Sequence, residues 1–157
     1  MNINISDEIL TCLGIDFGLK KVGVSLGQTI TCKARPLSIL KNDKVFMENI
    51  CEIIENWQPD VIIIGDPQTP NNAILSRELE KFSSSLESEY GSKIKIVKFS
   101  ETLSTEEAKM LFKELRKNKA LNKKKKQVDD ISACLILESW FNAVSYTHLT
   151  LPTIYSV

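Results

Sequence analysis

The sequence predicts an α/β fold with a mixed five-stranded sheet and helices on both faces. Residues 9–17 and 22–26 are nearly continuous apolar runs separated by a short glycine-containing turn, a pattern typical of a two-stranded hairpin. Residues 61–64 form a β-branched run, as expected for a central strand that is covered on both faces. Helical patterns then alternate with strands, and such crossover units favour a sheet placed between two helical layers.

The first half of the chain supplies most of the predicted sheet. The hairpin turns at residues 18–20, and a third short strand is expected within residues 30–40. A helix comes next, because apolar residues recur at helical spacing; they are Phe46, Ile50, Ile54 and Trp57. After the central strand, residues 65–72 hold two prolines and two asparagines and predict a loop.

The second half adds one strand and the remaining helices. A helix ends at Gly91, and its apolar face is formed by Leu75, Leu79, Phe82 and Leu86. Residues 94–99 predict the last strand, and the capping box at residues 104–107 opens another helix. A basic polar segment, residues 117–127, then leads to a final helix over residues 128–141. This last helix is apolar on nearly every side, which predicts deep burial.

Length and composition limit the class of protein. A chain of 157 residues predicts one domain, which we assign to residues 1–142. Residues 143–157 carry no charged side chain and are expected to form a foreign or disordered tail. The formal net charge is zero, so nucleic-acid binding would depend on local basic clusters. No apolar run approaches the ~20 residues of a membrane span, and four widely spaced cysteines fit a cytoplasmic protein.

Asp16 is the sharpest candidate for chemistry. It lies at the end of an apolar strand, where a carboxylate needs a partner, a hydrogen bond or a metal ion to offset its desolvation. An aspartate just before Gly18 can also simply stabilise a turn. The single histidine, His148, belongs to the tail, so Ser–His–Asp and Cys–His mechanisms have no suitable base. Carboxylates must therefore carry any catalysis.

Further carboxylates follow at the ends of other predicted elements. Glu101 comes directly after the strand at residues 94–99, and Asp129 and Asp130 lie in the first turn of the final helix. Acids at a helix start also stabilise the helix without any other function. Strand ends and helix starts are nevertheless where α/β sheets build their sites. Asp16, Glu101 and Asp129 together would bind Mg²⁺ or Mn²⁺, ions that support phosphodiester hydrolysis.

Basic residues are the candidates for nucleic-acid binding. A run of lysines just before Asp129 is either a solvated surface or a loop that contacts phosphates. Both tryptophans, Trp57 and Trp140, are expected in the core, so neither supports base stacking. The basic candidates are Lys20, Lys21, Lys33, Arg35, Lys123, Lys124 and Lys125.

Several stretches, in this order and spacing, resemble the YqgF/RuvX family. The longest is residues 13–24, Leu-Gly-Ile-Asp-Phe-Gly-Leu-Lys-Lys-Val-Gly-Val. The others are residues 34–37 (Ala-Arg-Pro-Leu), 57–60, 62–65, 103–108, 120–123, 128–129 and 136–141. Together they extend the resemblance over roughly residues 8–142.

The resemblance implies an RNase H-like fold and a nuclease function. Members are described as Holliday junction resolvases or as nucleases of pre-16S rRNA 5′-end processing. Asp16, Glu101 and Asp129 match the family's proposed metal-binding positions for Mg²⁺ or Mn²⁺. The implied partners are structured RNA, such as pre-rRNA, or branched DNA. A membrane partner is not expected, and the protein would be a monomer or a weak homodimer.

Three departures from the family pattern concern substrate contacts. The family's Gly-Leu-Pro-Leu turn reads Gly-Asp-Pro-Gln at residues 65–68, and the following Asp-Gly-Thr loop is replaced at residues 69–72. The usual Asp-Glu-Arg reads Ser-Glu-Thr at residues 100–102, which keeps the glutamate and loses an aspartate and an arginine. A weakened or altered nuclease is one reading of these changes.

Two other classes of function remain as alternatives. A non-catalytic module that binds RNA or assists ribosome assembly would need none of the carboxylates. An actin- or Hsp70-like ATPase also uses Asp-x-Gly in its first hairpin, but it normally has a hydroxyl residue where this chain has Leu19, and it needs a second domain.

Overall fold

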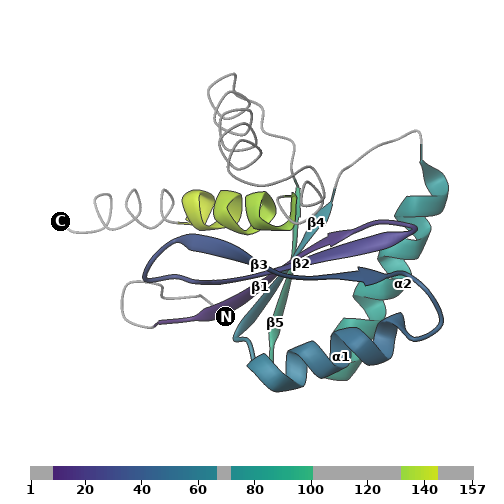
Figure 1. Cartoon of the computed structure of the whole chain (residues 1–157), viewed down its shortest axis with the longest axis horizontal. Helices are drawn as coiled ribbons and strands as arrows, with labels where there is room; N and C mark the ends of the chain where they lie inside the picture. The colour runs from purple at the N-terminus through teal and green to yellow at the C-terminus, as the bar shows by residue number, and fades with distance from the viewer. Residues whose placement is uncertain (1–8, 67–71, 101–131, 145–157) are drawn as a thin grey trace.

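The computed structural model describes residues 9–66, 72–100 and 132–144, and it contains the five-stranded mixed sheet that the sequence predicts (Figure 1). The strand order is β3-β2-β1-β4-β5. Strands β1, β2 and β3 pair antiparallel, whereas β1, β4 and β5 are parallel. The elements are β1 Thr11–Phe17, β2 Lys21–Gln28, β3 Lys33–Lys41, α1 Phe46–Trp57, β4 Val61–Asp66, α2 Ala73–Tyr90 and β5 Lys95–Ser100. A further helix, described over residues 132–144, is called the C-terminal helix below.

Helices α1 and α2 cover one face of the sheet (Figure 1). Alternate residues of the strands point into this layer, as the two-residue period of a strand requires. Phe17 at the end of β1 stacks on Phe82 of α2, with ring centroids 5.0 Å apart, and meets the edge of Phe46 at 6.1 Å. This aromatic cluster fixes the carboxyl end of β1 against both helices.

The C-terminal helix covers the opposite face (Figure 1). Its apolar residues pack on the other set of alternate strand residues, and they are Ile136, Leu137, Trp140 and Phe141. Cys12, Val61 and Ile63 form the strand side of this second core. The central strand β4 is therefore buried on both faces, which confirms the interpretation of its β-branched run.

Two expectations about local structure were wrong. The third strand, β3, spans nine residues instead of being short, and it contains an irregularity opposite the Val24–Ser25 step of β2. Pro36 is tolerated there because β3 lies at the edge of the sheet. Trp57 is not in the core; 41% of its surface is exposed, because it is the last residue of α1 and lies beyond the sheet's apolar face. Trp140 is buried as expected.

Some predicted segments lie outside the described residues. They are the helix opened at residues 104–107, the basic segment 117–127, the start of the final helix and the tail beyond residue 144. Within the described ranges, no helix is long and apolar enough to cross a membrane.

Candidate functional site

Asp16 lies at the carboxyl end of β1, the central position of the sheet, and its side chain is half-buried. Its neighbours on both sides lack side chains. Gly23 of β2 is its cross-strand partner, and Gly65 of β4 follows Ile64, the partner of Ile15. Neither glycine adds a side chain next to Asp16, and the Ile136 side chain of the C-terminal helix packs against Gly65.

The C-terminal helix runs antiparallel to β1 on the face that carries Asp16. Near the middle of β1, a methyl group added at Gly14 would lie 2.9 Å from the carbonyl oxygen of Ala133. Two residues earlier along the strand, Gly27, the partner of Cys12, approaches Phe141 instead. Moving along β1 toward its carboxyl end thus means moving toward the start of the helix.

Two buried polar side chains anchor this helix to the sheet. The Ser25 hydroxyl of β2 donates a hydrogen bond of 2.8 Å to the Ala133 carbonyl. The Glu138 carboxylate accepts a hydrogen bond of 2.9 Å from the backbone N–H of Ala34 in β3. Sequence reasoning assigned neither residue a role. Ser25 was detectable as the one hydroxyl within an apolar strand, whereas nothing local marks Glu138.

The parallel strands β1, β4 and β5 bring further polar residues to the edge where Asp16 lies. Asp66 and Ser100 end β4 and β5 and are register partners. Alternation along β4 puts Asp66 on the face of Ile62 and Ile64, which pack against α1 and α2, so it lies on the face opposite to Asp16. Of the three predicted metal-binding carboxylates, only Asp16 lies within the described part of the chain, and it lies at this edge.

The other two predicted carboxylates, Glu101 and Asp129, lie outside the described residues. Glu101 directly follows Ser100 in the sequence, and Asp129 precedes Ala133 by four residues. Over residues 9–66, 72–100 and 132–144, no group of three histidine, cysteine or acidic side chains is placed to hold a metal ion.

The predicted basic residues fall into two separate groups. Lys20 and Lys21 are exposed at the turn that follows Asp16, as expected for groups that contact a substrate bound there. Lys41, which the sequence did not single out, lies directly across from Lys21 in β3 and is also exposed. The turn is held by Asn42, whose side chain donates a 2.8 Å hydrogen bond to the carbonyl of Gly18. Positive charge therefore gathers beside the candidate aspartate.

The structure does not bring every predicted cation to this edge. Arg35 pairs with Leu26 and Lys33 pairs with Gln28, so both lie at the other end of β2 and β3. The antiparallel pairing explains the separation, because the start of β3 must meet the end of β2. Lys123, Lys124 and Lys125 lie outside the described residues.

Comparison with known proteins adds a family and a fold. The model of the family described as "RuvX: Holliday junction resolvase" matches residues 10–143. A curated protein of Shewanella oneidensis, named "Putative pre-16S rRNA nuclease", is 41% identical over 135 residues, covering 83% of this chain and 93% of its own length.

Two solved structures share the architecture. The RuvC protein of T. thermophilus in complex with a Holliday junction substrate superposes with a TM-score of 0.62 at 14% identity, over 87% of this chain and 96% of its own. The fowlpox virus Holliday junction resolvase gives a TM-score of 0.57 at 16% identity, over 86% and 99% of the two chains. These likenesses confirm the predicted RNase H-like fold.

Proposed function

The chain belongs to the RuvX family, and from this premise we propose that it is a metal-dependent nuclease that hydrolyses phosphodiester bonds in structured nucleic acid. The observation that carries the proposal is the position of Asp16. Its half-buried carboxylate lies at the carboxyl edge of the sheet, between two glycines and beside exposed lysines. An aspartate kept only to stabilise the turn would not need this arrangement of helix, glycines and cations.

The proposed metal is Mg²⁺ or Mn²⁺. Both ions prefer oxygen ligands, and the half-buried carboxylate of Asp16 at this edge supplies them. We assign Glu101 and Asp129 as the other ligands, because they follow β5 and precede Ala133 in the sequence. When bound, such ions stabilise the attacking and leaving oxygens of the displacement. The chain's own contribution is to hold the carboxylates together at one edge.

Lys20, Lys21 and Lys41 are proposed to contact phosphates on either side of the scissile bond. Each is exposed, and together they offset the negative charge of the Asp16 carboxylate toward an approaching polyanion. In this proposal Lys123, Lys124 and Lys125, which precede Asp129, extend the same basic surface.

We propose pre-16S rRNA as the substrate, with cleavage in 5′-end processing, because the Shewanella oneidensis relative carries that name at 41% identity. Branched DNA is the second candidate, favoured by the description of the family model. The proposal places the activity in the cytoplasm, which fits the four free cysteines. It requires no membrane partner and allows a monomer or a weak homodimer, with residues 1–142 as the nuclease domain.

The deciding experiment incubates the full chain with Mg²⁺ or Mn²⁺ and either a pre-16S 5′-leader RNA or a four-way DNA junction. We expect cleavage that Asp16→Asn reduces by at least about 100-fold, since it removes a charged ligand. Glu52→Gln is the matched control, because it removes the same charge at an exposed position in the middle of α1, outside the candidate site. It should leave cleavage within about twofold of the original.

Three outcomes would separate the alternatives. Cleavage of the RNA alone supports rRNA processing, and cleavage of the junction alone supports the resolvase. Nucleic-acid binding without cleavage, identical in the original protein and in Asp16→Asn, would overturn the enzyme proposal in favour of a binding module.

A further inference from the structure

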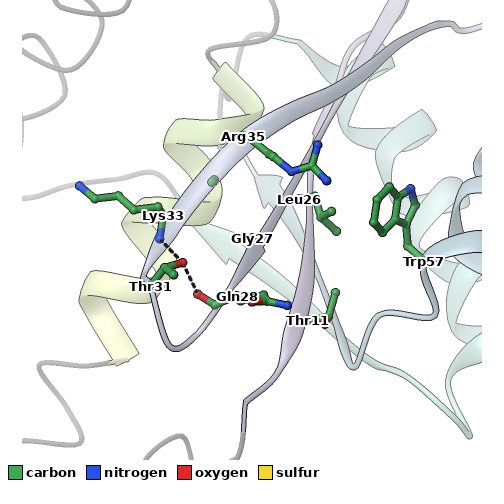
Figure 2. Close-up of a pocket in the computed structure, with 9 residues that line it drawn as sticks. Thr11, Leu26, Gly27, Gln28, Thr31, Lys33, Arg35 and Trp57 are labelled. Atoms are coloured by element: carbon green, nitrogen blue, oxygen red, sulfur yellow. Dashed lines mark hydrogen bonds between the residues drawn. The ribbon is translucent and has the colours of Figure 1, made fainter.

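A pocket of about 530 Å³ opens beside the exposed Trp57, at the end of the sheet away from Asp16 (Figure 2). It lies where β1 begins, β2 ends and β3 begins, next to the last turn of α1. Its volume falls within the range of sites that hold small organic ligands. The lining residues are Thr11, Leu26, Gly27, Gln28, Thr31, Lys33, Ala34, Arg35 and Trp57.

One wall of the pocket is an aromatic ring paired with a cation. The guanidinium carbon of Arg35 lies 5.4 Å from the centroid of the Trp57 ring, a cation–π distance. Figure 2 shows the guanidinium directed across the pocket toward Trp57, with Leu26 and Gln28 on the sheet side. The cation–π contact explains where Arg35 lies, but it does not explain the open volume beside the ring.

The charge of the pocket selects the class of ligand. Its lining contains two cations, Arg35 and Lys33, and no carboxylate. In Figure 2 the Lys33 side chain extends outward from the rim, whereas the Gln28 side chain points toward Thr11. A ligand that fits has a flat ring, polar edges and a negative charge. A partner protein segment would need an acidic and aromatic composition to satisfy the same surface.

We propose that this pocket binds an unpaired nucleotide of the nucleic-acid substrate. The base stacks on the Trp57 ring in place of the Arg35 guanidinium, its edge faces Gln28 and Thr11, and its phosphates meet the displaced Arg35 and, at the rim, Lys33. Stacking on an aromatic ring is open to every base, so the site recognises single strands without reading sequence. This inference rests on the proposed nuclease function, which identifies the negatively charged ligand as part of a nucleic acid.

The pocket is distinct from the candidate catalytic edge. Thr11 and Asp16 are five residues apart on β1, about 17 Å at the rise of an extended strand. The pocket also lies on the α1 side of the sheet, whereas Asp16 faces the C-terminal helix. One substrate molecule would therefore meet the two places with different segments, a paired or branched region at Asp16 and a single strand at Trp57.

The test measures binding in EDTA, so that catalysis plays no part. The full chain is titrated with a labelled eight-nucleotide oligouridylate and, in a second arm, oligothymidylate, with fluorescence anisotropy as the readout. Unlabelled oligonucleotide should also quench the tryptophan emission, because Trp57 is exposed while Trp140 is only 4% exposed. Binding of both oligonucleotides is expected, since stacking does not depend on the sugar.

Substitutions assign the binding to the pocket. Trp57→Ala should weaken it between about 5-fold and about 100-fold, and Trp57→Phe should recover part of the loss. Arg35→Gln should lower the slope of log affinity against log salt by about 1. Arg77→Gln is its matched control, an exposed arginine on α2 whose loss removes the same charge and should leave the slope unchanged.

Binding unchanged in Trp57→Ala and Arg35→Gln would overturn the inference, as would equal affinity for an abasic strand of the same length. If the original protein does not bind the oligonucleotides, the inference is overturned too, and a protein segment becomes the remaining candidate ligand for the pocket. The proposed nuclease function is tested separately, because Asp16→Asn should reduce cleavage by at least about 100-fold and keep oligonucleotide affinity. Loss of cleavage and loss of single-strand binding are therefore distinguishable failures.

Discussion

The hydroxyl of Ser25 donates a 2.8 Å hydrogen bond to the carbonyl oxygen of Ala133, which lies 108 residues later in the chain. Both residues are fully or almost fully buried. The contact joins β2 to the C-terminal helix at a residue four positions after Asp129 in the sequence. The geometry of the proposed metal site therefore depends on how firmly this helix is held to the sheet.

Replacing Ser25 should loosen that attachment. Ser25→Ala removes one buried hydrogen bond, worth about 1 kcal/mol, and should lower the melting temperature by about 2–4 °C. Cleavage should fall further than the loss of stability explains, because Asp129 would be positioned less well. Ser83→Ala is the control, since Ser83 is a similarly buried serine on α2, remote from the C-terminal helix. Equal cleavage by the two variants at 25 °C would contradict a positioning role for Ser25.

The close packing of Gly65 on Ile136 yields a prediction about paired substitutions. A methyl group added at Gly65 would overlap the end of the Ile136 side chain. Gly65→Ala should therefore cost about 1–3 kcal/mol through overpacking. Ile136→Ala alone should cost about 2–5 kcal/mol through the cavity it leaves.

The two changes should compensate each other in the double variant. The added methyl group enters the space that Ile136 vacates, so Gly65→Ala with Ile136→Ala should be more stable than the sum of the single losses. Urea denaturation of the four proteins in a double-mutant cycle measures this coupling. Strict additivity would show that β4 and the C-terminal helix are not in contact here.

The Cys12 thiol predicts how stability depends on alkaline pH. Burial, and secondarily the charge of Asp60, raises its pKa from 9.0 to about 12. The unfolded chain would lose this proton near pH 9 while the folded chain keeps it. The contribution of Cys12 to the free energy of unfolding is thus fully present below pH 9 and is lost as the pH rises toward 12. Cys12→Val should flatten the decline of melting temperature over this interval.

Tyr90 must be controlled in that experiment. Its pKa is also raised, first by burial and then by hydrogen bonding to Cys51. Tyr90→Phe should remove a second, separate part of the alkaline decline. A pH profile unchanged by Cys12→Val would show that this thiol does not titrate differently in the folded and unfolded chains.

The sequence was sufficient for the elements because each depends on local patterns. The β-branched run of β4, the stripe of α1 and the glycine at the end of α2 carry their own signals, and the hairpin turn follows from Gly18. The mixed five-stranded sheet with helices on both faces followed from the hairpin and the crossover units. These predictions are confirmed.

The position of side chains around the sheet was less predictable. Trp57 continues the apolar stripe of α1, but the helix ends there and its last residue extends past the sheet, which no periodicity reveals. Arg35 and Lys33 are close in sequence and were candidates for substrate binding. Antiparallel pairing of β3 with β2 places both at the end of the sheet away from Asp16. The roles of Ser25 and Glu138 depend on contacts with residues more than a hundred positions away. The grouping of Asp16 with Glu101 and Asp129 stays a prediction.

The placement of the C-terminal helix has a consequence for synthesis. The hairpin of β1 and β2 is translated about a hundred residues before the helix that covers its second face. Until that helix leaves the ribosome, Cys12, Val61 and Ile63 form an uncovered apolar surface on a nascent sheet. Asp16 is then already present without the helix beside it. A chain stalled before residue 132 should thus be an aggregation-prone folding intermediate without nuclease activity. Nuclease activity would arise only when the C-terminal helix packs onto the sheet, at the last step of folding.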